Sequence, residues 1–409
     1  MRSPLVVIFI TVFIDLVGFG LIIPTAPFIA RNFGASAAEV GLLMAIFSFM
    51  QFLFSPFWGA LSDRIGRRPT VLITLLGSAL SYFIFAFSNS LWLLFVSRAL
   101  AGLFGGNIST AHAYIGDVTP PQERSKGMGL IGAAFGLGFV FGPLLGAGLG
   151  IIGQKLGNHP PFGLSFSALV VGFLCLANCA FAWLRLKESL PPEVRARARE
   201  ANPRQGRLKT AWGQIRRPVT GSLMVVYFLS GLAMAQMESM LIPYMADRFH
   251  WGLEITMYGF AYIGVVMMIT QGFLVRYCMP KFGEPVVLCV GLVMFALSLF
   301  GLAAAGEVWG IGVAMTFLAL GNGLMRPPNL GIISLLTPPE EQGRSMGVTN
   351  SLASLGRILG PLLGGYLYES VSGRAPFIGA GVVALLALAM TVANYGQLPS
   401  SGKTTSEVT

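Results

Sequence analysis

The chain has 409 residues, of which 54% are hydrophobic and 11% are charged, and its net charge is +10. A water-soluble fold of this size cannot bury so much apolar surface, so the composition excludes an ordinary soluble enzyme or binding domain. No basic and aromatic motif typical of nucleic-acid binding accompanies the positive charge, so the expected neighbours are anionic lipid headgroups and no nucleic acid is expected.

Long apolar runs recur along the whole chain, each about 20 residues or more, which is enough for a helix to cross ~30 Å of hydrocarbon. No segment alternates at strand spacing, so we expect an all-α integral membrane fold. The first run contains Asp15, Pro24 and Pro27 and exceeds the apolar core of a signal peptide, so we interpret it as a retained helix. The twelve predicted transmembrane helices are 5–29, 39–61, 70–88, 91–113, 126–153, 162–186, 219–246, 253–276, 284–305, 307–333, 345–370 and 374–396.

Lysine and arginine are distributed unevenly across the predicted membrane. Of the 27, 20 lie in loops and termini on one side. The others are Arg31, Lys155, Arg248 and Arg374 on the opposite side, and Arg98, Arg326 and Arg357 within spans. By the positive-inside rule the basic side is cytoplasmic, and both termini lie there.

The sequence contains an internal repeat. Residues 119–129 read TPPQERSKGMG and residues 337–347 read TPPEEQGRSMG, an offset of 218 residues. The segment GPLLG at 142–146 recurs at 360–364 with the same offset. We infer two pseudo-symmetric six-helix bundles of the same orientation, because six spans return the chain to its starting side.

The repeat defines four predicted regions. The connecting region is rich in proline and in basic residues, and the end of the chain is rich in serine and threonine. The regions are an N-terminal six-helix bundle (1–186), a basic cytoplasmic linker (187–217), a C-terminal six-helix bundle (218–396) and a disordered cytoplasmic tail (397–409).

Several ionisable side chains fall within the predicted spans, where each costs at least ~2.5 kcal/mol unless a partner or water is present. Asp15 lies about 15 Å into the first helix, near the membrane midplane. We expect it to be a proton-coupling site with Arg98 as its cation, because desolvation favours the protonated carboxyl and a nearby cation opposes this. A permanent structural ion pair is the alternative. Glu238 is a candidate second proton site or substrate contact, or is simply hydrated near the outer surface.

The segment GALSDRIGRRP, residues 59–69, follows the second span. It resembles the signature loop of the major facilitator superfamily, in the form found in tetracycline/proton antiporters. From the residues alone, Asp63 can pair with Arg64 or Arg67, and a plain positive-inside loop is the alternative. The resemblance implies a conformational latch that re-forms as the halves move, at Gly59, Asp63, Arg64, Gly66, Arg67 and Arg68.

Glycines spaced by four and a proline mark the fifth span and its repeat. Such glycines allow close helix packing, and a proline bends the helix. The series resembles the antiporter motif of the family, with Ala147 where a second glycine is usual, and ordinary tight packing is the alternative. The residues are Gly138, Gly142, Pro143 and Gly146, with Gly356, Gly360, Pro361 and Gly364 in the repeat.

Residues 94–106 resemble the arginine-bearing fourth helix of the same family, so the resemblance covers nearly the whole chain. It implies a monomeric twelve-helix transporter of a bacterial inner membrane that exports a small amphipathic compound, drug-like or tetracycline-like, by proton antiport through alternating access. The third span carries no charge, unlike the tetracycline exporters, so tetracycline is only one candidate. The alternatives are an exporter or flippase of a lysolipid or lipid-like metabolite, and a proton-coupled or passive nutrient facilitator.

We expect a substrate cavity between the halves, where polar groups are set among apolar side chains. The amides among them can equally hold helices together. The candidates are Phe19, Gln51, Asn107, Gln236, Gln271, Asn322, Asn350 and Arg357.

No enzymatic or cofactor site is expected. The phosphate-binding pattern G-x-x-x-x-G-K-[ST] is absent. His112, His159 and His250 are far apart in sequence, and the four cysteines lack histidine or carboxylate partners at metal-ligand spacing. We therefore predict no metal, no cofactor and no catalytic residues, with energy supplied by an ion gradient.

Overall fold

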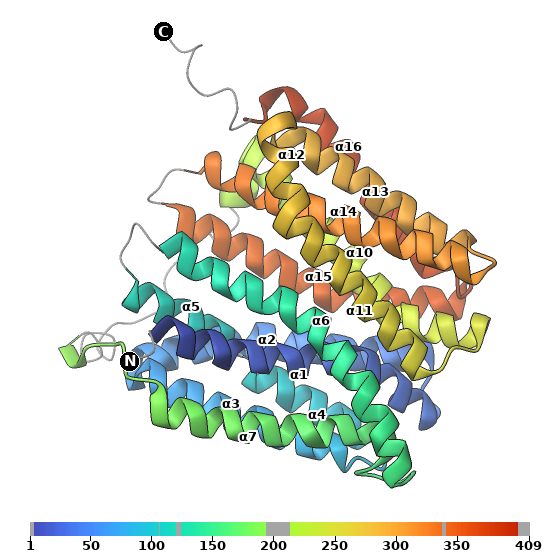
Figure 1. The fold of residues 1–409 in the computed structure, drawn as a ribbon. Coiled ribbons are helices and arrows are strands. Elements are labelled where there is room, and N and C mark those ends of the chain that lie inside the picture. The colour runs from blue at the N-terminus through green and yellow to red at the C-terminus, as the bar shows by residue number, and fades with distance from the viewer. Residues whose placement is uncertain (1–3, 106, 120–123, 194–212, 338–340, 400–409) are drawn as a thin grey trace. The chain divides into compact units, whose positions relative to one another are not determined.

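The computed structural model describes residues 4–105, 107–119, 124–193, 213–337 and 341–399 (Figure 1). Throughout these ranges the regular elements are helices, which confirms the predicted all-α fold. Most of the predicted linker, and the tail beyond residue 399, lie outside the described residues.

Ten helices in the described ranges are long and apolar enough to cross a membrane, and they coincide with ten of the predicted spans. Helix α11 continues through a short π-helical turn, Thr270–Leu274, into α12 (Val275–Phe282). The ten helices, with α11 counted as one span together with α12, are α1 (Pro4–Asn32), α2 (Ala37–Ile65), α3 (Arg67–Ala86), α6 (Arg124–Leu156), α7 (Phe166–Arg185), α10 (Pro218–Phe249), α11 (Leu253–Ile269), α13 (Glu284–Ala304), α14 (Val308–Leu335) and α16 (Ala375–Ala393).

The two remaining predicted spans are also helical. Span 345–370 lies within α15 (Gln342–Ser370), a helix of 29 residues. Span 91–113 corresponds to two helices, α4 (Leu91–Phe104) and α5 (Asn107–Val118). The prediction of a single helix there is wrong, because α4 ends at its C-terminal cap, Gly105. The twelve-span count is consistent with this arrangement.

Local capping explains where some of the helices begin. Ser36 precedes α2, and its hydroxyl accepts a hydrogen bond from the amide of Glu39 while the Glu39 carboxylate accepts one from the amide of Ser36. This reciprocal pair satisfies two amides that have no partner within the helix. Ser90 caps the start of α4 in a similar way, through the amide of Leu93.

The chain forms two compact units. The first comprises Met1–Pro203 and His250–Ala261, and the second comprises Arg204–Phe249 and Tyr262–Thr409. The start of α11 therefore belongs to the first unit, where Met257 packs with Ala147 of α6.

In the first unit, α1 packs closely against α6 (Figure 1). A Cβ added at Gly142 would lie 2.7 Å from the carbonyl carbon of Gly20. One added at Gly138 would lie 2.9 Å from the carbonyl oxygen of Leu16. Glycine is required at both positions because the two backbones touch there.

The second unit repeats this contact with α10 and α15. A Cβ at Gly360 would lie 2.6 Å from the carbonyl oxygen of Leu232, and one at Gly356 would lie 3.0 Å from the amide nitrogen of the same residue. One at Gly364 would lie 2.9 Å from Cγ of Met240. The internal repeat of the sequence is therefore also a repeat of helix packing, first helix against fifth in each set of six spans.

Candidate functional site

Arg98 is a buried charge in the first unit. Its side chain is 4% exposed, and its guanidinium carbon lies 4.9 Å from the ring centroid of Phe85 and 5.9 Å from that of Tyr82. Its Nε and Nη2 atoms have no hydrogen-bond partner among the described residues. Aromatic faces attract a cation but do not replace hydrogen bonds, so this guanidinium keeps donors available within the bundle.

Tyr82 connects Arg98 to the first helix. It lies within electrostatic range of both Asp15 and Arg98. A Cβ added at Gly18 would lie 2.9 Å from the Tyr82 hydroxyl, so that hydroxyl reaches α1 within a turn of Asp15. Asp15 itself is half-buried. The pairing of Asp15 with Arg98 was predicted from the sequence, but the position of Tyr82 was not, because a tyrosine in an apolar span usually belongs to the core.

The second unit holds a cluster of three charges. Glu238 of α10 is half-buried and lies within electrostatic range of Arg326 and Arg357. The guanidinium carbon of Arg326 lies 5.9 Å from the ring centroid of Tyr227. Arg357 is exposed, and its Nη2 donates a hydrogen bond to the hydroxyl of Ser354 over 3.0 Å. Glu238, the candidate second proton site, therefore has two arginines as neighbours.

The predicted latch is built around Arg67, which is 7% exposed. Its Nη1 donates to the Asp63 carboxylate over 2.5 Å, which is one of the two pairings that the sequence allowed. The same atom donates to the Ser62 hydroxyl over 2.7 Å, and Nε donates to the Asp117 carboxylate over 3.0 Å. Arg67 thus links the end of α2, the start of α3 and the end of α5.

A glycine and a glutamate complete this network. Gly66 separates α2 from α3 with a φ of 110°, a conformation that favours glycine. The Glu188 carboxylate lies beside it and accepts hydrogen bonds from the amides of Arg67 and Arg68 over 2.9 and 3.2 Å. A carboxylate at this position satisfies free amides at the start of a helix and complements its dipole. The contact of Glu188 with the latch was not predicted.

The other predicted latch residues belong to the same segment, at the end of α2 and the start of α3. Gly59 has open space around its Cβ position, and its carbonyl accepts a hydrogen bond from Ser62. Arg64 is exposed, and Arg68 donates to the carbonyl of Trp183 over 2.6 Å. The start of α3 is therefore held to the end of α7 as well.

Two predicted cavity amides hold helices together. Nε2 of Gln51 donates to the carbonyl of Gly105 over 3.0 Å, which joins α2 to α4. Nε2 of the buried Gln236 donates to the carbonyl of Pro376 over 2.8 Å, which joins α10 to α16. Their role as substrate contacts stays a prediction.

The remaining cavity candidates differ in exposure. Phe19 is half-buried and packs on Phe47, with ring centroids 5.2 Å apart. Asn322 is buried, with its amide nitrogen 3.3 Å from the Met267 sulfur and no hydrogen-bond partner for Oδ1 among the described residues. Gln271 and Asn350 are exposed. The side chain of Asn107 lies outside the described ones.

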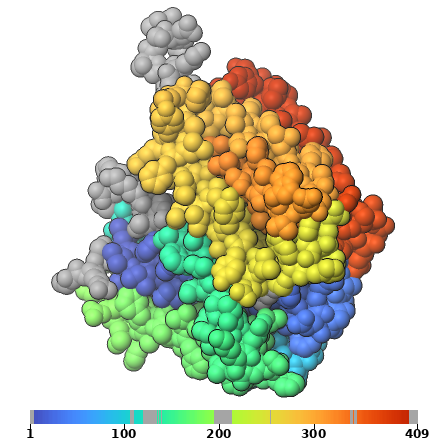
Figure 2. Space-filling model, turned by 45° about the vertical axis from the view of Figure 1, so that its right-hand side comes forward, coloured from blue at the N-terminus to red at the C-terminus, as the bar shows by residue number. Residues whose placement is uncertain are grey.

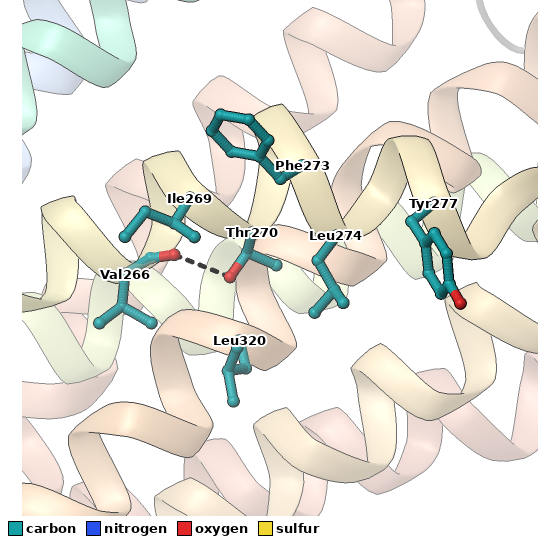
Figure 3. Close-up of a pocket in the computed structure, with 7 residues that line it drawn as sticks. All are labelled: Val266, Ile269, Thr270, Phe273, Leu274, Tyr277 and Leu320. Carbon is teal, nitrogen blue, oxygen red and sulfur yellow. Dashed lines mark hydrogen bonds between the residues drawn. The ribbon is translucent and has the colours of Figure 1, made fainter.

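An apolar groove of about 340 Å³ runs along α11, the π-helical turn and α12 (Figure 3). Thr270 is one of the lining residues, and its hydroxyl donates a hydrogen bond to the carbonyl of Val266 over 2.7 Å. Figure 2 shows the yellow to gold surface of α11 and α12 on the face turned to the viewer. None of the predicted cavity residues lines this groove, whose lining is Val266, Ile269, Thr270, Phe273, Leu274, Tyr277 and Leu320.

The helix order, the repeated packing and the charged loop can be compared with known families. A family model described as the Major Facilitator Superfamily matches residues 8–283 and 274–408. The chain belongs to the major facilitator superfamily. It is a multi-pass membrane transporter and not an enzyme.

Individual relatives of this superfamily cover nearly the whole chain. The class C tetracycline resistance protein of Escherichia coli is 33% identical over 388 residues, 93% of this chain and 94% of that protein. Multidrug resistance protein 2 of Bacillus subtilis (strain 168) is 28% identical over 392 residues, 96% and 95% of the two chains. The crystal structure of the human organic anion transporter MFSD10 (TETRAN) matches with a TM-score of 0.70 at 24% identity, over 96% of this chain and 100% of that chain.

Proposed function

We propose that this transporter exports a small amphipathic compound, drug-like or tetracycline-like, in exchange for inward-moving protons. The observation that carries the proposal is a carboxyl group within a membrane-spanning helix of each half, Asp15 in α1 and Glu238 in α10. Such groups are costly in a membrane and mark proton or substrate pathways. The similarity to proteins named for tetracycline and multidrug resistance supports export of a drug-like compound.

In this mechanism Asp15 takes up a proton from outside and releases it inside. Tyr82 lies close enough to respond to its charge, and Arg98 lies beside Tyr82. When Asp15 is protonated, its electrostatic interaction with Tyr82 weakens. The equilibrium between the outward-facing and inward-facing states then shifts. A compound that binds the deprotonated state better is then exchanged for the proton.

The latch and the glycine contacts serve the conformational change. The Arg67 network holds three helix ends together and can break and re-form as a unit. The glycine contacts of α1 with α6 and of α10 with α15 keep each half rigid while it moves. We place the protein as a monomer among the lipids of a bacterial inner membrane, with both termini cytoplasmic.

The proposal is tested with purified protein in liposomes that enclose a pH-sensitive dye. Tetracycline, other amphipathic drugs and lysolipids are added outside in turn, with protein-free liposomes as the control. Exchange predicts that the lumen becomes more alkaline when a transported compound enters and protons leave. Entry of a compound without any change of internal pH would contradict proton antiport. A response to lysolipids alone would favour a lipid exporter.

A further inference from the structure

We propose that the second unit binds an acidic group of the transported molecule at Arg326 and Arg357, so that the substrate is an amphipathic molecule carrying a carboxylate, sulfonate or similar anion. This inference names the substrate class of the proposed exporter, and it rests on that function only in treating the bound molecule as cargo.

Arg357 lies at the middle of α15 (Gln342–Ser370) and is nevertheless exposed. A guanidinium has five N–H donors in a planar fork. In the described part of the chain, its hydrogen bond is the one to Ser354, on its own helix. An arginine at mid-span that is neither buried nor engaged by a carboxylate at hydrogen-bond distance is exceptional, because such a charge needs a partner, water or ligand. The fork therefore remains available for an anion that presents two oxygens, such as a carboxylate or a sulfonate.

Arg326 supplies a second positive charge. It projects from α14, and Tyr227 of α10 lies beside it. Arg326 and Arg357 lie within electrostatic range of one another, and each is within range of Glu238. Two like charges held close together repel one another, which is unfavourable. The cost falls when an anion binds to both.

The charge balance of this cluster determines which ligand fits. An ionised Glu238 neutralises one of the two arginines and leaves a net charge of +1. A cationic substrate would meet this excess charge and be repelled, and an uncharged one would leave it uncompensated. An acidic group completes the neutralisation and accepts the free donors of Arg357. Glu238 then acts as an internal competitor, because its carboxylate and that of the substrate seek the same arginines.

The test is equilibrium dialysis of radiolabelled probes against the purified full-length protein in detergent, without any ion gradient. The probes share one apolar body and differ in charge: naphthalene-2-sulfonate, naphthalene-2-sulfonamide and 2-naphthyltrimethylammonium. We expect the sulfonate to bind most tightly. Arg357→Gln should weaken sulfonate binding about tenfold or more while the sulfonamide changes less than about twofold, because only the sulfonate engages the charge. Arg276→Gln, which removes an exposed charge of α12, is the matched control.

A second variant tests the competition. Glu238→Gln should bind the sulfonate more tightly than the wild type, since the internal competitor has lost its charge. This result does not depend on whether Arg357→Gln folds. Sulfonate binding that is unchanged or weaker in Glu238→Gln, equal losses of all probes in Arg357→Gln, or preference of the wild type for the cation would each overturn the inference.

The outcome separates this inference from the proposed function. A protein that selects the sulfonate through Arg357 but moves no protons in liposomes would keep the anion site and contradict proton exchange. A protein that exchanges a drug for protons without any preference for the sulfonate would support proton exchange and contradict the anion site.

Discussion

Arg67 donates a hydrogen bond to the carboxylate of Asp117 over 3.0 Å, although the two residues are 50 positions apart. The contact ties the start of α3 to the end of α5, and the guanidinium also engages Asp63 and Ser62. The Arg67 side chain is only 8% exposed and the Asp117 side chain 23%, so solvent screens this pair less than a surface pair.

Replacing Asp117 by Asn should therefore destabilise the protein and slow transport. Loss of a hydrogen bond between charged groups costs about 2 kcal/mol, because the buried Arg67 loses half of its neutralisation. Thermal unfolding in detergent would show a lower midpoint. Glu193→Gln, which removes an exposed acid of the same unit, should leave the midpoint unchanged. Equal midpoints for wild type and Asp117→Asn would contradict a structural role for the pair.

Glu188 should stabilise the first unit through its carboxylate. Besides the amides of Arg67 and Arg68, it accepts hydrogen bonds from the amides of Ser189 and Leu190, each over 3.1 Å. Glu188→Ala should cost about 2 kcal/mol, because four amides lose an anionic acceptor. Glu188→Gln keeps an acceptor oxygen and loses the charge, so its cost should be smaller, about 1 kcal/mol at most. A lower unfolding midpoint for Glu188→Gln than for Glu188→Ala would contradict stabilisation through these hydrogen bonds.

The close contact of α1 and α6 predicts unequal tolerance among glycines of one helix. Gly142→Ala should destabilise by about 1–3 kcal/mol, because its Cβ would overlap the Gly20 backbone. Gly148→Ala, in the same helix but with open space around it, should be neutral or slightly stabilising. Gly360→Ala should repeat the loss in the second unit. Unfolding curves of the three variants check this, and similar curves for Gly142→Ala and Gly148→Ala would exclude the packing role.

The periodicity and repeats of the sequence predicted the fold because they reflect local physics. Length and hydropathy determine a membrane-spanning helix, and a repeat of glycines at fixed spacing anticipates the contacts of Gly142 and Gly360. The pairing of Asp63 with Arg67 was among those predicted because both lie within four residues of one another. The break at Gly105 was missed because glycine is common within membrane-spanning helices, so a glycine there does not by itself indicate a helix end.

Contacts between distant segments could not be predicted from the single sequence. Glu188 reaches Arg67 across 121 residues, and nothing in its neighbours indicates a helix cap elsewhere. Tyr82 was overlooked because its phenol becomes informative only when α1 and α4 are placed beside it. Arg357 was expected to face a cavity, but its proximity to Arg326 and Glu238 depends on the packing of α10, α14 and α15.

Uphill transport tests the central claim most directly. Liposomes containing the wild type or Asp15→Asn are prepared with an acidic lumen, and labelled tetracycline, or whichever compound responds in the dye assay, is added outside. Glu254→Gln, an exposed acid of α11, is the control. Proton exchange predicts that the wild type and the control accumulate the compound above its external concentration, whereas Asp15→Asn only equilibrates it. Accumulation by Asp15→Asn equal to that of the wild type would contradict the coupling role of Asp15, and absence of accumulation by the wild type for every such compound would contradict proton-driven export.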